Sequence, residues 1–230
     1  MRKVSRGFSW LALATAVFGA GIAPARAGSP GTQPTSGAET TAGEGEAERW
    51  ALSGDFSGYF FFHGGDGDFL QPTIYADRGP LHLEARYNYE DRDTASLWGG
   101  WTFSFGKSVT VDLTPILGVV FGDTDGIAPG LETALAWKAL EFSSQSEYLF
   151  DSNDRQSNYF YAWSEVSWRQ PEWLRYGLVI QRTRVYQTPL DVQFGALAGF
   201  SFWKMELTAY YFNPTHSEDD FAVLTAGFEF

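Results

Sequence analysis

Polar side chains occupy alternate positions in the segment 81–90, where His82, Glu84, Arg86, Asn88 and Glu90 are separated by apolar or aromatic residues. Side chains two residues apart lie on the same face of an extended chain. If this segment is a strand, an imidazole, two carboxylates and a guanidinium share one surface. Such a row of fixed charges can either pair internally as salt bridges or line a passage for ions.

The same alternation recurs along the chain from residue 50 onward, in segments of about ten residues, the length that a tilted membrane strand requires. We predict twelve antiparallel strands and no helix; the join near Ala139 is short, and ten strands is the alternative. The predicted strands are 50–62, 70–77, 81–90, 95–105, 109–121, 130–138, 140–150, 159–169, 173–185, 190–203, 204–212 and 221–230.

Two kinds of connection alternate between these strands. Short turns are expected at 78–80, 106–108, 139, 170–172 and 203–204. Longer and more acidic loops are expected at 63–69, 91–94, 122–129, 151–158, 187–189 and 213–220. Short turns on one side and long loops on the other are typical of transmembrane β-barrels.

The last ten residues, 221–230, combine period-two alternation with a terminal aromatic residue, and Phe228 and Phe230 stand at the very end. This ending resembles the C-terminal strand of outer-membrane β-barrels of Gram-negative bacteria. The resemblance is to an architectural class and to no particular family. It implies an all-β, up-and-down antiparallel transmembrane barrel over 49–230, with Phe228 and Phe230 as part of the signal for membrane insertion.

Residues 1–27 have the features of a secretory signal peptide: Arg2, Lys3 and Arg6 precede an apolar stretch, and 25–27 reads Ala-Arg-Ala. An uncleaved anchor is the alternative, but the apolar stretch is short for a membrane-spanning helix. Residues 28–48 are rich in Gly, Ser, Thr, Pro and Glu, which predicts a disordered periplasmic linker. An even strand number then places both termini of the barrel on the periplasmic side.

Charge and cysteine content narrow the possible partners. Loss of 1–27 removes four of the 16 basic residues and none of the 28 acidic ones, which changes the net charge from −12 to −16. This balance argues against nucleic acid, whose phosphates require clustered Lys and Arg. The chain has no cysteine, which excludes disulfides, cysteine metal sites and a lipid-modified cysteine.

A secreted β-sandwich is the alternative fold, because its strands also have one apolar face. The placement of aromatic residues favours the barrel, since two aromatic bands match the interfacial girdles of membrane barrels. Four tryptophans adjoin the short turns: Trp137, Trp168, Trp173 and Trp203. Eight further aromatics lie near the long loops: Tyr59, Tyr87, Tyr89, Phe121, Tyr148, Phe150, Tyr159 and Tyr211.

Placing the apolar set of each strand against lipid assigns the polar set to the lumen. On 81–90 this rule turns Leu81, Leu83, Ala85, Tyr87 and Tyr89 outward. The acidic residues assigned to the lumen are Asp55, Asp77, Glu84, Glu90, Asp112, Glu132, Glu141, Glu147, Glu165, Glu206 and Glu229. The basic ones are Arg86, Lys138, Arg169, Arg175 and Lys204. An open pore lined in this way favours cations, whereas salt bridges that only hold the wall together are the alternative.

Twelve strands imply a backbone diameter of about 23 Å and a lumen no wider than about 10 Å. We therefore expect a small passive channel for cationic or neutral solutes. The residues expected at its constriction are Glu84, Arg86, Asp112, Glu147, Glu165 and Arg175. The expected partners are the outer membrane with its lipopolysaccharide, the barrel-assembly machinery and small solutes.

Two alternatives remain open. One is a closed structural or adhesive barrel with acidic surface loops. The other is a lipid-modifying enzyme of the outer leaflet, which would need His63 or His216 as a base, although no orienting partner is evident for either. No catalytic residue, cofactor or protein metal ligand is assigned. Divalent cations at the acidic outer loops, such as Asp123 and Asp125, are a further possibility, but no acidic residue completes a calcium-binding loop there.

Overall fold

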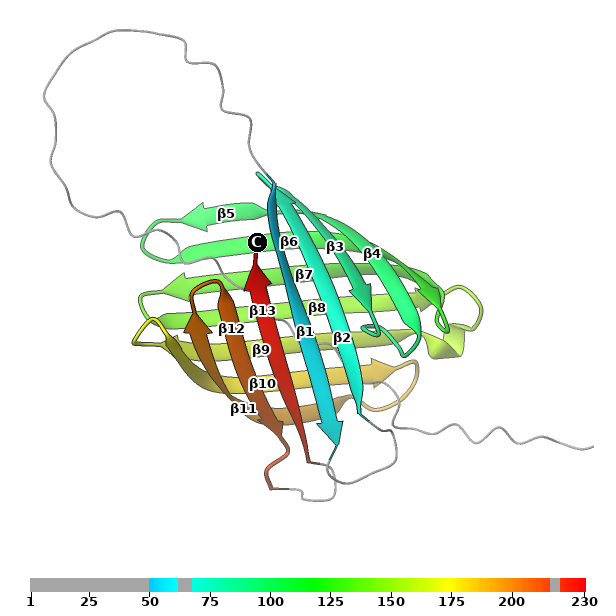
Figure 1. Cartoon of the computed structure of the whole chain (residues 1–230). Coiled ribbons are helices and arrows are strands. Elements are labelled where there is room, and N and C mark those ends of the chain that lie inside the picture. The colour runs from blue at the N-terminus through cyan, green and yellow to red at the C-terminus, as the bar shows by residue number, and fades with distance from the viewer. Residues whose placement is uncertain (1–49, 62–67, 216–219) are drawn as a thin grey trace, which may run out of the picture.

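Consecutive strands pair with one another in chain order and close into an antiparallel barrel (Figure 1). This computed structural model describes residues 50–61, 68–215 and 220–230. The strands are β1 (Ala51–Phe61), β2 (Phe69–Arg78), β3 (Leu81–Tyr87), β4 (Thr94–Trp101), β5 (Phe103–Gly106), β6 (Thr110–Gly122), β7 (Gly126–Trp137), β8 (Leu140–Asp151), β9 (Tyr159–Arg169), β10 (Leu174–Val185), β11 (Asp191–Phe202), β12 (Met205–Phe212) and β13 (Phe221–Glu229).

The first and last strands close the barrel. β1 pairs with β13 from Ser53↔Glu229 to Phe61↔Phe221, and the backbone N–H of Phe230 donates to the carbonyl of Leu52 (2.9 Å). Closure removes the free edges that an open sheet leaves unpaired. The signal peptide (1–27) and linker (28–48) lie outside the described residues and stay predictions.

β4 and β5 together form one of the twelve barrel strands. Both pair with β6, and they are separated only at Thr102, whose N–H donates instead to the carbonyl of Pro80 (2.7 Å). The predicted strand 95–105 is thus present with a local break. The predicted all-β, twelve-stranded, up-and-down barrel is confirmed, and the ten-stranded alternative is wrong. The described helical content is one turn, η1 (Arg155–Ser157), and no described helix is long and apolar enough to span a membrane.

The wall is apolar outside and polar inside. On β2, Leu70 and Ile74 are 64% and 59% exposed, whereas Gln71 and Thr73 between them are almost fully buried. A sandwich buries its apolar face between two sheets, so this opposite arrangement in a closed single wall overturns the sandwich alternative.

The connection between β6 and β7 is shorter than predicted. It comprises only residues 123–125, because Gly126 and Ile127 already pair with Val120 and Val119 of β6. The strand accommodates both Gly126 and Pro129, because barrel walls tolerate such residues where pairing is interrupted. The pairing of β7 with β8 does skip positions 128 and 129.

The aromatic bands are present in part. The four tryptophans at the short turns are all exposed, as are Tyr87, Phe121, Phe150 and Tyr211 near the loops. Tyr89 and Tyr159, however, are only 3% and 5% exposed and lie inside the barrel. The prediction that Tyr89 faces lipid is wrong, because β3 ends at Tyr87 and Asn88 adopts a positive φ of 55°, which breaks the strand alternation.

Candidate functional site in the barrel lumen

Arg86 lies at the centre of the larger charged cluster in the lumen. Its side chain extends from β3 and is only 3% exposed. Nε donates to Glu84 Oε2 (2.6 Å), and Nη1 donates to Glu147 Oε2 on β8 (3.0 Å). β4, β6 and β7 separate β3 from β8 in the wall, so the Arg86–Glu147 pair crosses the interior of the barrel.

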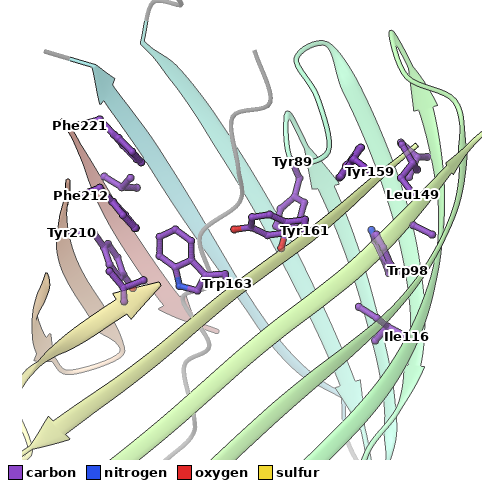
Figure 2. Packing of buried hydrophobic residues seen from close by; sticks show 14 of the residues in the cluster. Tyr89, Trp98, Ile116, Leu149, Tyr159, Tyr161, Trp163, Tyr210, Phe212 and Phe221 are labelled. Atoms are coloured by element: carbon purple, nitrogen blue, oxygen red, sulfur yellow. The ribbon is translucent and has the colours of Figure 1, made fainter. Parts of the chain in front are cut away.

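Two aromatic rings pack against the same guanidinium. The Cζ atom of Arg86 is 4.0 Å from the ring centre of Tyr89 and 4.2 Å from that of Trp98. Such cation–π contacts add to the ion pairs most strongly where water is excluded. Figure 2 shows Tyr89 inside the barrel, close to Tyr161 of β9.

The loop that connects β3 to β4, residues 88–93, directs Tyr89 and Glu90 into the lumen. The carboxylate of Glu90 accepts hydrogen bonds from Ser96 Oγ (2.6 Å) and Trp98 Nε1 (3.1 Å). Its carbonyl accepts one from the Tyr159 hydroxyl (3.1 Å), and Tyr89 hydrogen-bonds the Gln145 side chain. These two side chains therefore narrow the lumen next to β3 and β4, a feature that strand alternation could not predict.

His82 extends the Arg86 cluster to further carboxylates. Its Nδ1 is 2.7 Å from Asp77 Oδ1, and its Nε2 is 2.9 Å from Glu84 Oε1 and 3.6 Å from Glu132 Oε2. Glu132 Oε1 also lies 3.9 Å from Arg86 Nη2. The Arg86 cluster thus brings five carboxylates to one arginine and one histidine. These carboxylates belong to Asp77, Glu84, Glu90, Glu132 and Glu147.

A second cluster gathers around Arg175 on the wall formed by β8 to β12. Arg175 Nη2 donates to Glu165 Oε2 (2.9 Å) and to the Tyr210 hydroxyl (3.2 Å). Glu206 links it to Arg169, with Oε1 3.5 Å from Arg175 Nε and Oε2 3.0 Å from Arg169 Nη1. Arg169 also pairs with Glu141 (2.8 Å). Here three carboxylates face two arginines.

Aromatic side chains fill the lumen next to the Arg175 cluster (Figure 2). The ring of Trp163 lies edge-on to those of Tyr210 (5.3 Å) and Phe212 (5.1 Å), and Phe212 stacks on Phe221 at 4.7 Å. Trp163 Nε1 donates to Glu165 (2.7 Å), which connects this aromatic group to the charged network. The interior is therefore narrowed by packed rings as well as by ion pairs.

Five of the six residues expected at the constriction fall in these clusters. Glu84, Arg86 and Glu147 meet in the Arg86 cluster, and Glu165 and Arg175 meet in the other. Asp112, on β6, is half-buried and takes part in none of the described contacts of either cluster. The sequence alternation had placed Tyr89 against lipid, so this lumen residue was missed. It did assign four further cluster residues to the lumen, although not to the constriction: Glu90, Glu132, Glu141 and Glu206.

The described acidic loop residues hold their own loops together. Asp125 Oδ1 accepts from the N–H of Gly122 (3.2 Å), and Asp151 Oδ1 accepts from the N–H groups of Asn153 and Asp154 (2.7 and 2.6 Å). Burial raises the pKa of the Asp91 carboxyl above its ordinary value, although hydrogen bonds to its oxygens oppose this shift. The divalent cations expected at these loops stay a prediction.

The enzyme alternative depends on residues 63 and 216. Both histidines lie outside the described residues, so that prediction is also untested. His82 is the histidine that the described residues contain, and it belongs to the lumen network rather than to the outer wall.

Comparison with known proteins gives the fold its context. No protein-family model and no curated protein matches the sequence. Among solved structures, the chain is similar to the KdgM porin (TM-score 0.55, 10% identity, covering 77% of this chain and 99% of that one). It is also similar to the NanC porin (TM-score 0.51, 10% identity, covering 78% and 99%). The predicted resemblance to outer-membrane barrels is confirmed at the level of the fold: the chain has the closed antiparallel β-barrel fold of these porins.

Proposed function

We propose that the protein is a small passive channel of the outer membrane that prefers cations. The charge of its lumen carries this proposal. In the two clusters together, eight carboxylates face three arginines and one histidine. Because a narrow, low-dielectric passage amplifies the effect of fixed charge, an acidic excess favours the entry of cations over anions.

The constriction in this proposal is formed by Glu84, Arg86, Glu147, Glu165 and Arg175, with Asp112 on the lumen wall outside both clusters. Packed rings restrict the remaining width to small solutes, since the backbone of a twelve-stranded barrel is only about 23 Å across. One KdgM structure was obtained in complex with disordered oligogalacturonate, a polyanion. The acidic lumen of this chain disfavours such a solute, so we infer a different substrate class.

We also propose an orientation of the barrel in the outer membrane. The exposed apolar belt faces the lipid, both termini face the periplasm, and the longer acidic loops face outward toward lipopolysaccharide, where divalent cations could bridge them to lipid phosphates. Phe228 and Phe230 contribute to recognition by the barrel-assembly machinery during insertion.

Reversal potential under a KCl gradient in planar bilayers tests the channel. We expect conductance steps with K⁺ preferred over Cl⁻, and a smaller preference when Glu84 and Glu165 are both changed to Gln. The matched control is Glu172→Gln, which removes a carboxylate from an exposed turn outside the lumen. Anion preference, or a preference that the double variant leaves unchanged, would refute the proposal.

One observation favours the closed structural barrel as a second candidate. Tyr161, Trp163 and Arg86 are only 1%, 1% and 3% exposed, so parts of the interior are tightly filled. If the folded, heat-modifiable protein shows no conductance, this candidate replaces the channel.

A further inference from the structure

We propose that His82, Glu84 and Glu132 form a binding site for one divalent transition-metal ion of the zinc class inside the lumen. The three side chains come from β3 and β7, and their donor atoms all lie within 4.8 Å of one another. His82 Nε2 is 2.9 Å from Glu84 Oε1 and 3.6 Å from Glu132 Oε2. Ligands about 2.0–2.1 Å from a tetrahedral Zn²⁺ are separated by roughly 3.3 Å, so these distances need little adjustment.

Asp77 orients the imidazole for this role. Its Oδ1 lies 2.7 Å from His82 Nδ1, an arrangement in which Nδ1–H donates to the carboxylate and Nε2 is the nitrogen that can bind a metal. A carboxylate–histidine pair of this kind fixes the tautomer and raises the basicity of metal-bound histidines. Metal binding displaces the proton that Nε2 would otherwise share with Glu84, and the other nitrogen keeps its partner.

The carboxylates of the site have free capacity for a cation. Glu84 is held through Oε2 by Arg86 (2.6 Å), which leaves Oε1 directed at His82. Glu132 Oε1 is buried and has no hydrogen-bond partner, although its side chain is 16% exposed overall. A buried carboxylate oxygen whose nearest cationic nitrogen, Arg86 Nη2, is 3.9 Å away is poorly compensated, and a metal ion bound by this carboxylate would offset that cost.

The negative net charge of the Arg86 cluster favours binding of a divalent cation over binding of a proton or a monovalent cation. Five carboxylates surround Arg86 and His82, so the Arg86 cluster keeps an acidic excess even with a charged imidazole. One histidine nitrogen with two carboxylate oxygens is a donor set that suits Zn²⁺ and its neighbours in the transition series. Ca²⁺ and Mg²⁺ instead prefer six or more oxygen ligands.

Zinc titration of the folded, tag-free protein in detergent, followed by calorimetry, tests the site without any conductance measurement. We expect one Zn²⁺ per chain, no heat from Ca²⁺ at that stoichiometry, and a higher thermal midpoint with bound zinc. His82→Ala should abolish binding. Asp77→Asn, which keeps the side-chain shape, should weaken binding about 10–100-fold, and Glu132→Gln at least as much. Heat-modifiable mobility verifies that each variant is folded.

The double variant His63→Ala/His216→Ala is the control, because it removes every other imidazole and should bind zinc like the parent. Absence of stoichiometric binding by the parent protein would overturn the site, as would unchanged affinity in both Asp77→Asn and Glu132→Gln. The site stands independently of the channel: a barrel that binds zinc but conducts nothing would refute the proposed function alone.

Discussion

Replacement of Arg86 by Met should strongly destabilise the barrel. Methionine has a similar length and no charge, so the variant removes the ion pairs to Glu84 and Glu147 and the contacts to the rings of Tyr89 and Trp98. Both carboxylates have side chains at most 1% exposed. They would be left as buried negative charges whose nearest compensation is gone.

The expected magnitude follows from that burial. Removing one partner of a buried, hydrogen-bonded ion pair costs about 3–5 kcal/mol, because the remaining charge is desolvated and unpaired. A solvated pair would lose only about 1 kcal/mol or less. The triple variant Arg86→Met/Glu84→Gln/Glu147→Gln should recover more than half of the loss, since neutral amides replace the uncompensated carboxylates.

Urea unfolding in lipid vesicles, monitored by tryptophan fluorescence, measures the free energy of unfolding. Arg155→Met is the matched control: Arg155 also packs on an aromatic ring, that of Tyr186 at 5.5 Å, but it lies in an exposed loop and should cost under about 1 kcal/mol. A loss for Arg86→Met as small as that of the control would refute the reasoning. It would show that lumen water solvates the Arg86 cluster and that the ion pairs do not hold the wall.

Three further predictions concern packing, gating and assembly. A Cβ on Gly118 would overlap the indole ring of Trp98, so Gly118→Ala should lower the free energy of unfolding by about 1–3 kcal/mol in the same urea assay. Gly227→Ala is the control and should be nearly neutral, because the nearest atom to a Cβ at that position is 3.8 Å away. Tyr89→Ala should raise single-channel conductance if loop 88–93 narrows the passage, and an unchanged or lower conductance would argue that the constriction lies elsewhere. Phe230 is 77% exposed, so Phe230→Ser should leave the stability of the refolded barrel unchanged. The same change should reduce the amount of heat-modifiable protein in outer-membrane fractions. Equal amounts of the parent and variant proteins there would show that Phe230 is not part of the insertion signal.

Strand number and wall polarity followed from the sequence because both depend on local rules. Side chains alternate with a period of two along any extended segment, so the inward positions of His82, Glu84 and Arg86 could be predicted before any partner strand was known. The connections were predictable where turn residues were dense, as at Gly79-Pro80. The predicted loop 122–129 was too long, because residues 126–129 pair with β6 as the first part of β7.

The identity of the partners inside the lumen was decided only by the tertiary structure. Arg86 and Glu147 are 61 residues apart and meet because the curvature of the closed wall brings these side chains of β3 and β8 together inside the lumen. Alternation assigned Asp112 to the same interior but could not tell that it stays outside both clusters. The alternation rule could not place Tyr89, because the positive φ at Asn88 ends the alternation and turns the Tyr89 side chain inward. Period-two patterning determines which face a side chain occupies, whereas contacts across a barrel depend on strand stagger and loop conformation, which are properties of the closed fold.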